Sequence, residues 1–352
     1  MRLLYRSQRV CASVFLLMVL LLLHCSACAF ASAPFPFLMD IGGLSGATLS
    51  PPVPRVAAGR IFECPHPCGL VPHFDGAGQP VNGGLPQAGN MSLHLERLRA
   101  TFDKYVPLNE SRLMDFDFEN WNPVWARNSP SASPNVRNAS VARVRAAHPD
   151  WDPDTVEAAA QAEFESAAQT WLAATMTYMR QIRPQLRVAM YGYPTRYYYH
   201  GYNDTTQGPL LRAQNDALFP LWCHMDAIMP SVYQFYDSCN RSSARAPNEE
   251  YVRSNVREAV RIAGEVARRC AAQTKPPPVL VYTWHRYHDG TRFVCDADET
   301  MTWSISAEEG ANGVVLWGDE RQTEDNFETY WAKDFAPLAL AWSPPELPDS
   351  GT

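Results

Sequence analysis

The sequence predicts an α/β fold, specifically a distorted (β/α) barrel of TIM type that forms a single domain. Five short apolar strand signals follow residue 110, and a helix signal lies between each one and the next. Parallel strands need such crossover connections, and the helices then cover the sheet. No GxGxxG pattern follows any strand, which favours a barrel over a doubly wound open sheet, the alternative that we retain.

Local signals place each element in turn. The longest helix begins with Asp152 as N-cap and Pro153 at its first position, and it stops at Pro184. The other expected helices are Met91–Tyr105, Leu211–Cys223, Glu249–Ala272, a helix capped by Asp298 that ends near Gly310, and Glu324–Phe335. The expected strands are Leu113–Phe118, Arg187–Tyr193, Asp226–Tyr233, Pro278–Trp284 and Gly313–Gly318. One or two further strands are expected in the Pro- and Gly-rich stretch 34–84.

The first 33 residues read as a signal peptide. Three arginines precede an apolar run from Val10 to Leu23, and small residues follow, so cleavage after Ala29 or Ala33 is expected. This run is shorter than the roughly 20 residues that span a bilayer. A retained type II membrane anchor is the alternative.

The remaining chain divides into a barrel domain, residues 34–343, and a polar tail, residues 344–352, without a lipid-anchor pattern. The leader holds three Arg and no acid, so its removal makes the formal charge of −7 more negative by three. An acidic protein of this kind is not expected to bind nucleic acid. We expect a secreted or lysosomal monomer without stable membrane insertion after cleavage.

Cysteines and sequons fit an exported protein. Six cysteines lie beyond the leader and are disulfide candidates with 15 open connectivities: Cys64, Cys68, Cys223, Cys239, Cys270 and Cys295. Five sequons are expected glycosylation sites: Asn90, Asn109, Asn138, Asn203 and Asn240. The Cys-Pro-His-Pro-Cys segment resembles half a zinc site but has no second half, so we expect neither metal nor cofactor.

The stretch MDFDFENW carries the candidate chemistry. Asp115, Asp117 and Glu119 alternate with Phe116 and Phe118, so on a strand the three carboxylates share one face. Like charges this close raise at least one pKa, which supplies a proton donor near neutral or acidic pH. At the carboxyl end of a barrel strand these groups face the substrate. The alternative is a solvated acidic edge strand with its phenylalanines on the core.

Two tryptophans follow the acids. Trp121 and Trp125 are aromatic surfaces that could stack on sugar rings. We expect Trp121, together with Asp115, to contact the substrate.

Five ordered motifs resemble those of the animal hyaluronidases of glycoside hydrolase family 56. The segments are GQPVNGGLPQAGNMSLHLERL, DFENWNPVWARN, YGYPTRYY, QNDALFPLWCHMDAIMPSVY and GANGVVLWG. The second is similar to the family's catalytic motif DWExWRPxW. The resemblance covers roughly Gly78 to Trp342, and it implies a retaining endo-β-N-acetylhexosaminidase that cleaves β-1,4 bonds of hyaluronan, chondroitin or a related N-acetylated glycan.

Residue roles follow from the resemblance alone. Glu119 would be the general acid and then the base, and Asp117 would orient the substrate's acetamido group, whose carbonyl oxygen is the nucleophile. Tyr197 and Tyr233 would hydrogen-bond around that group, and Trp317 would close the subsite.

The sequence also departs from the family pattern. Phe118 replaces a Trp, Asn122 an Arg, Arg196 a Cys and Asp319 a Ser. A non-catalytic glycan-binding relative is therefore a second hypothesis. A chitinase-like hydrolase is a third, because DFDFE resembles the end of the DxxDxDxE motif, although Arg112 stands where that motif has its first Asp.

Overall fold

The computed structural model describes residues 35–41, 50–129, 133, 135–194, 206–271, 275–288, 292–318 and 327–345. The chain clusters into two units, residues 1–35 and 36–352, and nearly all described residues belong to the second. The expected leader, Tyr197, Asn203 and Asp319 lie outside the described residues. None of the described helices combines the length and apolar character needed to cross a membrane.

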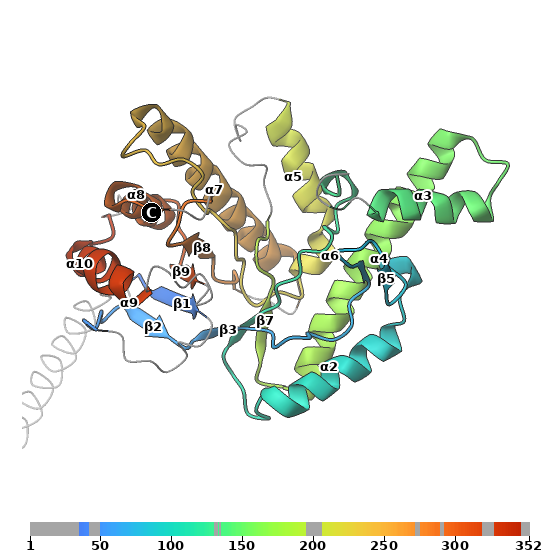
Figure 1. Ribbon diagram of the computed structural model, residues 1–352, viewed down its shortest axis with the longest axis horizontal. Helices are drawn as coiled ribbons and strands as arrows, with labels where there is room; N and C mark the ends of the chain where they lie inside the picture. The colour runs from blue at the N-terminus through green and yellow to red at the C-terminus, as the bar shows by residue number, and fades with distance from the viewer. Residues whose placement is uncertain are drawn as a thin grey trace, which may run out of the picture. The chain divides into compact units, whose positions relative to one another are not determined.

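The strands form two parallel sheets and one small hairpin, and Figure 1 labels most of them. They are β1 (Phe37–Ile41), β2 (Val56–Ala58), β3 (Ile61–Glu63), β4 (His73–Phe74), β5 (Pro80–Val81), β6 (Leu113–Asp115), β7 (Arg187–Ala189), β8 (Leu280–Trp284) and β9 (Gly313–Gly318). One sheet has the order β2-β1-β9-β8 and another the order β3-β6-β7, with every pair parallel. The hairpin joins β4 and β5. The α/β class predicted from the sequence is confirmed.

The expected strand Asp226–Tyr233 is not a continuous strand, although it connects the two parallel sheets. Single bridges link Met229 to Tyr191 beyond β7, and Ser231 to Tyr282 in β8. Pro230 lies between the bridging residues and has no N–H to donate, so a regular ladder is interrupted there. The sequence therefore correctly predicted parallel pairing here, but its prediction of a continuous strand is wrong.

Both sheets face one apolar core. Its buried members come from every parallel strand except β2 and from the bridging segment: Leu38, Ile61, Leu113, Ala189, Ala227, Met229, Leu280, Tyr282 and Val315. Strands β1 and β3 also contact each other. Among the described residues no hydrogen-bonded pairing joins β1 or β2 to β3.

Helices connect the strands along the chain (Figure 1). They are α2 (Met91–Tyr105), α3 (Val136–Ala147), α4 (Pro153–Ile182), α5 (Gln207–Ala217), α6 (Phe219–Trp222), α7 (Arg245–Arg269), α8 (Asp296–Glu308), α9 (Phe327–Tyr330) and α10 (Ala336–Ala341). Short 3₁₀ turns are η1 (Pro86–Ala88), η2 (Trp125–Arg127) and η3 (Ser242–Ala244), and η4 (Trp331–Phe335) is a π-helix. Asp152 caps α4 as expected, because its side chain accepts from the backbone N–H groups of Asp154 and Thr155.

Three helix expectations need correction. The expected helix Leu211–Cys223 is two helices, α5 and α6, on either side of Leu218. Cys295, not Asp298, is the N-cap of α8, and Asp298 lies in its first turn, where it accepts from the backbone N–H of Ser238. The carboxylate of Asp298 therefore accepts a hydrogen bond from Ser238, which is distant in sequence, and does not cap the helix. The last expected helix, Glu324–Phe335, is described from Phe327 on as two pieces, α9 and η4, and α10 follows beyond its expected end.

The structure also pairs the six candidate cysteines. The disulfides are Cys64–Cys68, Cys223–Cys270 and Cys239–Cys295. This confirms disulfide bonding and selects one of the 15 connectivities that the sequence left open.

Candidate active site

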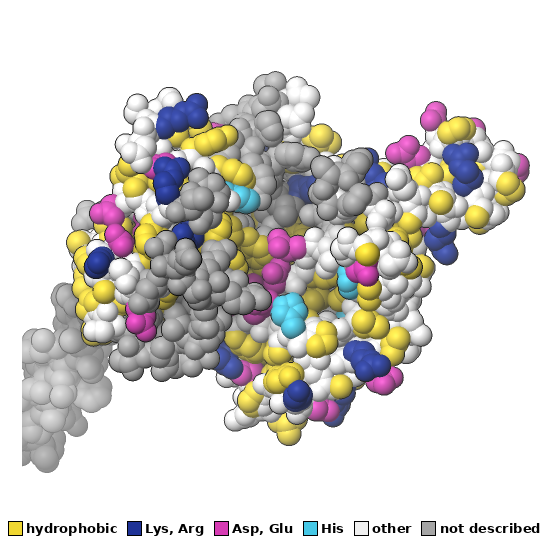
Figure 2. All heavy atoms as spheres, in the orientation of Figure 1, with side chains coloured by type: hydrophobic (Ala, Val, Ile, Leu, Met, Phe, Trp, Pro, Cys, Tyr) yellow, Lys and Arg dark blue, Asp and Glu magenta, His cyan; other side chains and the backbone are white. Residues whose placement is uncertain are grey.

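The carboxyl ends of the parallel strands bring acidic residues together. Asp115 ends β6, and its neighbours in register are Glu63 at the end of β3 and Ala189 at the end of β7. Asp40 lies near the end of β1. Figure 2 shows acidic side chains gathered near the centre of one face, over the strands labelled β3 and β7 in Figure 1.

Exposure increases along the acidic segment after β6. Asp115 is buried, Asp117 is half-buried and Glu119 is exposed. The intervening Phe116 is buried and its ring lies 6.5 Å from that of half-buried Phe118, centroid to centroid. The predicted alternation of acidic and aromatic residues thus continues beyond the end of β6. The two phenylalanine rings lie together, and the three acids run from the core to the surface.

The surroundings of Asp117 and Glu119 favour their protonated forms. Desolvation raises the pKa of Asp117 to about 7, and the negative charges of Glu119, Glu63 and Asp40 add to this. Desolvation also raises the pKa of Glu119, because protein atoms surround its carboxyl group although much of the side chain is accessible. Asp117 can therefore exchange a proton near neutrality, and Glu119 keeps its proton to a higher pH than an ordinary glutamate does.

A second acidic layer lies beneath this pair. The Tyr282 hydroxyl lies 2.7 Å from Oδ2 of Asp40 and 2.9 Å from Oδ2 of Asp115. Desolvation raises the pKa of Asp40 to about 6, against the opposing hydrogen bond from Tyr282. Desolvation, followed by the charges of Asp40 and Asp117, raises the pKa of Asp115 well above its usual range.

Asp115 therefore lies deeper than the sequence suggested. It is only 2% exposed, so it underlies Asp117 and cannot reach a substrate directly in this structure. The expectation that Asp115 contacts the substrate is corrected in this respect.

Four half-buried aromatic residues stand at the ends of the neighbouring strands. The rings of Tyr233 and Trp317 are stacked with centroids 5.9 Å apart, and Trp284 lies 5.5 Å from Trp317. Tyr191 lies 5.9 Å from Tyr233, and its hydroxyl donates to Oγ of Ser231. We call Tyr191, Tyr233, Trp284 and Trp317 the aromatic wall.

Tyr191 links the aromatic wall to the acids. Desolvation raises its pKa, and the negative charges of Glu119 and Asp117 raise it further. Sequence reasoning did not single out Tyr191 or Trp284. Tyr191 follows the core residue Ala189 by two positions, and Trp284 follows Tyr282 by two. Because side chains two positions apart on a strand share a face, this spacing could have identified both residues.

The two tryptophans after the acids do not form an open surface. Trp121 is 1% exposed and its indole N–H donates to the carbonyl of Pro72 at 2.6 Å, and Trp125 is 4% exposed. Both rings pack against Phe164 of α4. The expectation that Trp121 and Trp125 stack on sugar rings is therefore corrected, because tertiary packing against α4 covers them.

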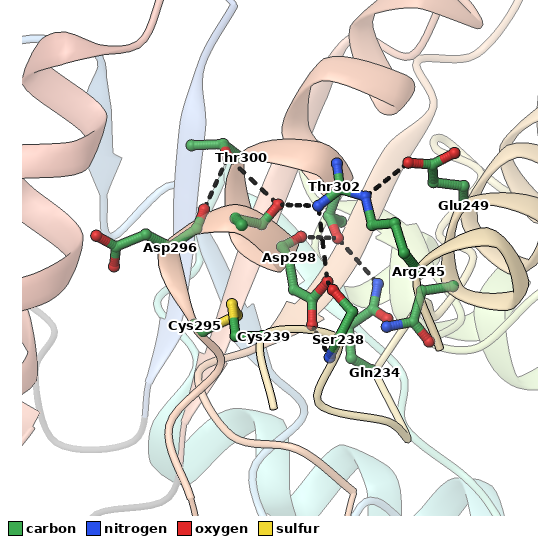
Figure 3. A network of polar contacts seen from close by, with 12 residues as sticks. Gln234, Ser238, Cys239, Arg245, Glu249, Cys295, Asp296, Asp298, Thr300 and Thr302 are labelled. Atoms are coloured by element: carbon green, nitrogen blue, oxygen red, sulfur yellow. Dashed lines mark hydrogen bonds and ion pairs between the residues drawn. A yellow bond between two sulfur atoms is a disulfide. The ribbon is translucent and has the colours of Figure 1, made fainter. Parts of the chain in front are cut away.

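A buried polar network holds the chain segment that follows Tyr233 (Figure 3). Asp298 of α8 accepts from the backbone N–H of Ser238 at 2.9 Å and also from its hydroxyl. The adjacent Cys239 forms a disulfide with Cys295, the N-cap of α8. The segment is thereby fixed to α8, which limits the movement of the aromatic wall beside it.

A possible metal cluster among the described residues has another explanation. Potential ligand atoms of Asp237, Cys239 and Cys295 lie within 4.8 Å of one another. The two cysteines form a disulfide, so neither offers the thiolate that a metal would require.

The described sequon asparagines lie at the surface. Asn90, Asn109, Asn138 and Asn240 are all exposed. Asn90 also caps α2 through Oδ1, which accepts from the backbone N–H of Leu93. Glycosylation at these positions stays a prediction.

Comparisons with known proteins agree with this geometry. The family model described as hyaluronidase matches residues 63–336, which include the acids after β6 and most of the strands. Mouse (Mus musculus) hyaluronidase-2 is 34% identical over 274 residues, covering 76% of this chain and 56% of the mouse protein. Human (Homo sapiens) hyaluronidase-1 is 37% identical over 279 residues, covering 77% and 61%. The chain thus spans little more than half the length of these curated relatives.

Solved structures show the same relationship. The crystal structure of bee venom hyaluronidase superposes with a TM-score of 0.72 at 25% identity, covering 87% of this chain and 99% of the bee chain. The same bee protein in complex with a hyaluronic acid tetramer gives a TM-score of 0.68 at 27% identity, covering 80% and 86%. Sequence match, structural match and site geometry agree, and the chain belongs to the hyaluronidase family, glycoside hydrolase family 56.

Proposed function

We propose that this protein is an endo-β-N-acetylhexosaminidase that hydrolyses β-1,4 bonds of hyaluronan, chondroitin or a related N-acetylated glycan. The observation that supports the proposal is the pair Asp117 and Glu119. Both carboxyls have raised pKa values, and both act electrostatically on Tyr191 of the aromatic wall. The bee venom relative's complex with a hyaluronic acid tetramer supports hyaluronan as the first substrate to test.

The proposed reaction is retaining and substrate-assisted. Protonated Glu119 donates its proton to the leaving glycosidic oxygen while the acetamido carbonyl oxygen attacks the anomeric carbon, so the glycosidic bond breaks as the internal bond forms. The Glu119 carboxylate then takes a proton from water, whose oxygen attacks the same carbon and opens the cyclic intermediate. Ionised Asp117 orients the acetamido N–H and stabilises the positive charge that develops there.

The aromatic wall would bind the sugar at the cleavage point. Half-buried rings such as Tyr233 and Trp317 offer one face for stacking, and their neighbours fix their orientation. Tyr197 is proposed, from the family resemblance, to hydrogen-bond to the acetamido group.

We also propose the finer features of the protein. The segment Asp226–Tyr233, whose single bridges connect the two sheets, and the shared core support one distorted (β/α) barrel. Three disulfides and exposed sequons support export to the extracellular space or the lysosome.

The test replaces the proposed acid. Glu119→Gln keeps the shape of the side chain but cannot donate the proton, so release of reducing ends should fall about 10²–10⁴-fold. Hyaluronan, chondroitin, chitin oligomers and unsulfated heparosan are assayed in parallel to identify the glycan. The control is Glu96→Gln, on the exposed surface of α2, which should retain the wild-type rate.

The outcomes separate the hypotheses. An unchanged rate in Glu119→Gln contradicts the mechanism. Wild-type protein that is retained on a hyaluronan column but cleaves none of the four glycans at any pH from 4 to 8 supports the non-catalytic relative instead.

The pH dependence gives a second test. A raised carboxyl pKa keeps the proton to higher pH, so Asp117 is protonated below about pH 7 and ionised above it. Because the proposed mechanism needs ionised Asp117, the acidic limb of the pH–rate profile should lie at about pH 7, and the alkaline limb should report loss of the proton from Glu119. An acidic limb at about pH 4, where an ordinary aspartate titrates, would contradict this role of Asp117.

A further inference from the structure

One phenol connects two buried carboxyls beneath the proposed catalytic pair. Tyr282 is fully buried, and Asp40 and Asp115 are 9% and 2% exposed. The hydroxyl of Tyr282 lies within hydrogen-bonding distance of an oxygen of each, at 2.7 Å and 2.9 Å.

The number of protons at this site follows from the chemistry of the groups. A phenol has one proton and donates to one acceptor at a time, whereas an ionised carboxylate can only accept. If both carboxyls were ionised, one carboxylate oxygen would face the phenol oxygen without any hydrogen between them, inside the protein. If one carboxyl is protonated, it donates to the phenol oxygen while the phenol donates to the other carboxylate.

The remaining oxygen of Asp115 favours the same conclusion. Its Oδ1 is buried and has no hydrogen-bond partner among the described residues. A neutral carboxyl tolerates an unpaired oxygen far better than a carboxylate does.

We propose that Asp40, Tyr282 and Asp115 share one proton, so that the two carboxyls together carry a single negative charge beneath Asp117. We call these three residues the relay. They are positioning residues for the proposed reaction, because they act on the substrate only through Asp117.

The charges around the relay explain why one proton matters. Asp115 faces Asp117 in its own segment, Glu63 from β3, Asp40 from β1, and Tyr282 from β8, and the tyrosine is the only one that lowers its pKa. Tyr233 also lies within electrostatic reach of Asp115 and Asp40. A second negative charge in the relay would raise the pKa of Asp117 further, in addition to the charges that already raise it.

The effect on Asp117 is direct. The charges of Glu119, Glu63 and Asp40 each raise its pKa. Holding one proton in the relay limits this rise, so Asp117 can ionise near neutral pH, as its proposed role with the acetamido group requires.

The relay also fixes the geometry. It joins the carboxyl ends of β1 and β6 to the middle of β8, and these strands belong to both parallel sheets. Asp117 follows Asp115 by two residues, so the anchor on Asp115 limits where Asp117 can lie.

Asparagine substitutions test how many of the two relay carboxyls are ionised. In Asp40→Asn or Asp115→Asn, the amide donates to the phenol oxygen in place of the shared proton, and the remaining carboxylate keeps the single charge. The acidic limb of the pH–rate profile, which reports ionisation of Asp117, should therefore stay in place in each single variant, whatever the change in maximal rate. In the double variant the charge is gone, and the limb should move to lower pH by about half to one unit.

Other charge states give other patterns. If both carboxyls are ionised, each single variant shifts the limb by itself, which overturns the proposal. If both are protonated, or if they do not influence Asp117, the double variant shifts nothing, which also overturns it.

A second readout does not depend on catalysis, since the profile rests on the proposed function. With ¹³C-labelled aspartate carboxyls, NMR at pH 8 should show one protonated resonance that disappears in both Asp40→Asn and Asp115→Asn. The control Asp103→Asn removes an exposed carboxylate whose pKa is lowered by the hydrogen bond from Arg99, so it should remove an ionised resonance only. If the wild type cleaves no glycan, this result still tests the relay.

Tyr282→Phe completes the test. Without the phenol the shared proton loses its bridge, so the protonated resonance should shift and the variant should melt at a lower temperature at pH 8 than at pH 5, relative to wild type. A Tyr282→Phe protein with an unchanged resonance would show that the phenol does not hold the proton. If this variant does not fold, the asparagine variants decide the question.

Discussion

Asp298 and Asp115 are the two most deeply buried aspartates among the described residues, and their surroundings differ completely. Asp298 is 0% exposed and accepts from the backbone N–H of Ser238 at 2.9 Å and from its hydroxyl. The Tyr287 hydroxyl donates to it at 2.8 Å, and a guanidinium nitrogen of Arg245 lies 3.9 Å away. Figure 3 shows Ser238 and Arg245 directed toward Asp298.

Asp115 is buried to almost the same degree but has few partners. Tyr282 is the one side chain found to hydrogen-bond to it among the described residues, and its Oδ1 has no partner. Other acids surround it and raise its pKa. Several hydrogen-bond donors thus stabilise the buried carboxylate of Asp298, which fixes two segments together, whereas a shortage of donors at Asp115 favours a carboxyl that keeps its proton.

Removing the disulfide beside Asp298 should have the largest effect on stability. Cys239 and Cys295 are 56 residues apart, so the double serine variant should lose about 4 kcal/mol of unfolding free energy through the loop entropy of the unfolded chain. Urea unfolding measures this. The Cys64→Ser/Cys68→Ser variant is the control, because its separation of 4 residues should give about 2 kcal/mol. Equal losses would argue against the loop-closure explanation.

Asp298→Asn should cost stability and not chemistry. It removes a charged acceptor from buried donors, so we expect about 2–3 kcal/mol lower unfolding free energy. The turnover of the folded fraction should stay within threefold of wild type. Asp296→Asn, exposed on the same helix turn, is the control with a small effect. If Asp298→Asn instead abolished turnover at full stability, the contrast between the two aspartates would fail.

Glu299 is a third case that sharpens the comparison. It is buried, accepts from the Tyr330 hydroxyl and has an unpaired Oε2. Desolvation raises its pKa to about 8. A raised carboxyl pKa means that the folded state holds the proton longer than the unfolded state. The stability it contributes is therefore complete below about pH 4.5 and is lost as the pH rises toward 8.

Glu299→Gln should remove this pH dependence. The difference in unfolding free energy between pH 5 and pH 8 should become smaller by on the order of 2 kcal/mol. Urea titrations at the two pH values test it, with Glu96→Gln as the exposed control. The same slope in Glu299→Gln and wild type would show that Glu299 titrates normally.

The smallest expected effect concerns Trp121, beside the acids but not part of their chemistry. Trp121→Phe removes the hydrogen bond to the Pro72 carbonyl and should cost about 1 kcal/mol of stability, with KM unchanged within twofold. Trp317→Phe, in the aromatic wall, should raise KM by more than that. A tenfold increase of KM in Trp121→Phe would restore the sugar-stacking role that its burial contradicts.

Much of the fold was predictable because its signals are local. The bounds of α2 and α4 agree with their expected ranges, since a capping side chain and the apolar period lie within a few residues of each other. Strand β9 also agrees. Strand Asp226–Tyr233 and the cap at Asp298 were wrong because Pro230 and the contact with Ser238 changed the local pattern.

The sequence by itself determined that three acids alternate with two phenylalanines after an apolar strand, and period-two geometry then directs them to one side. Only the tertiary structure decided that Asp115 is buried, that Trp121 is covered by α4, and that the cysteines pair as they do. It also brought Asp40 and Tyr282 to Asp115 across 75 and 167 residues of sequence. Such contacts depend on which strands meet in space, and no local propensity encodes that choice.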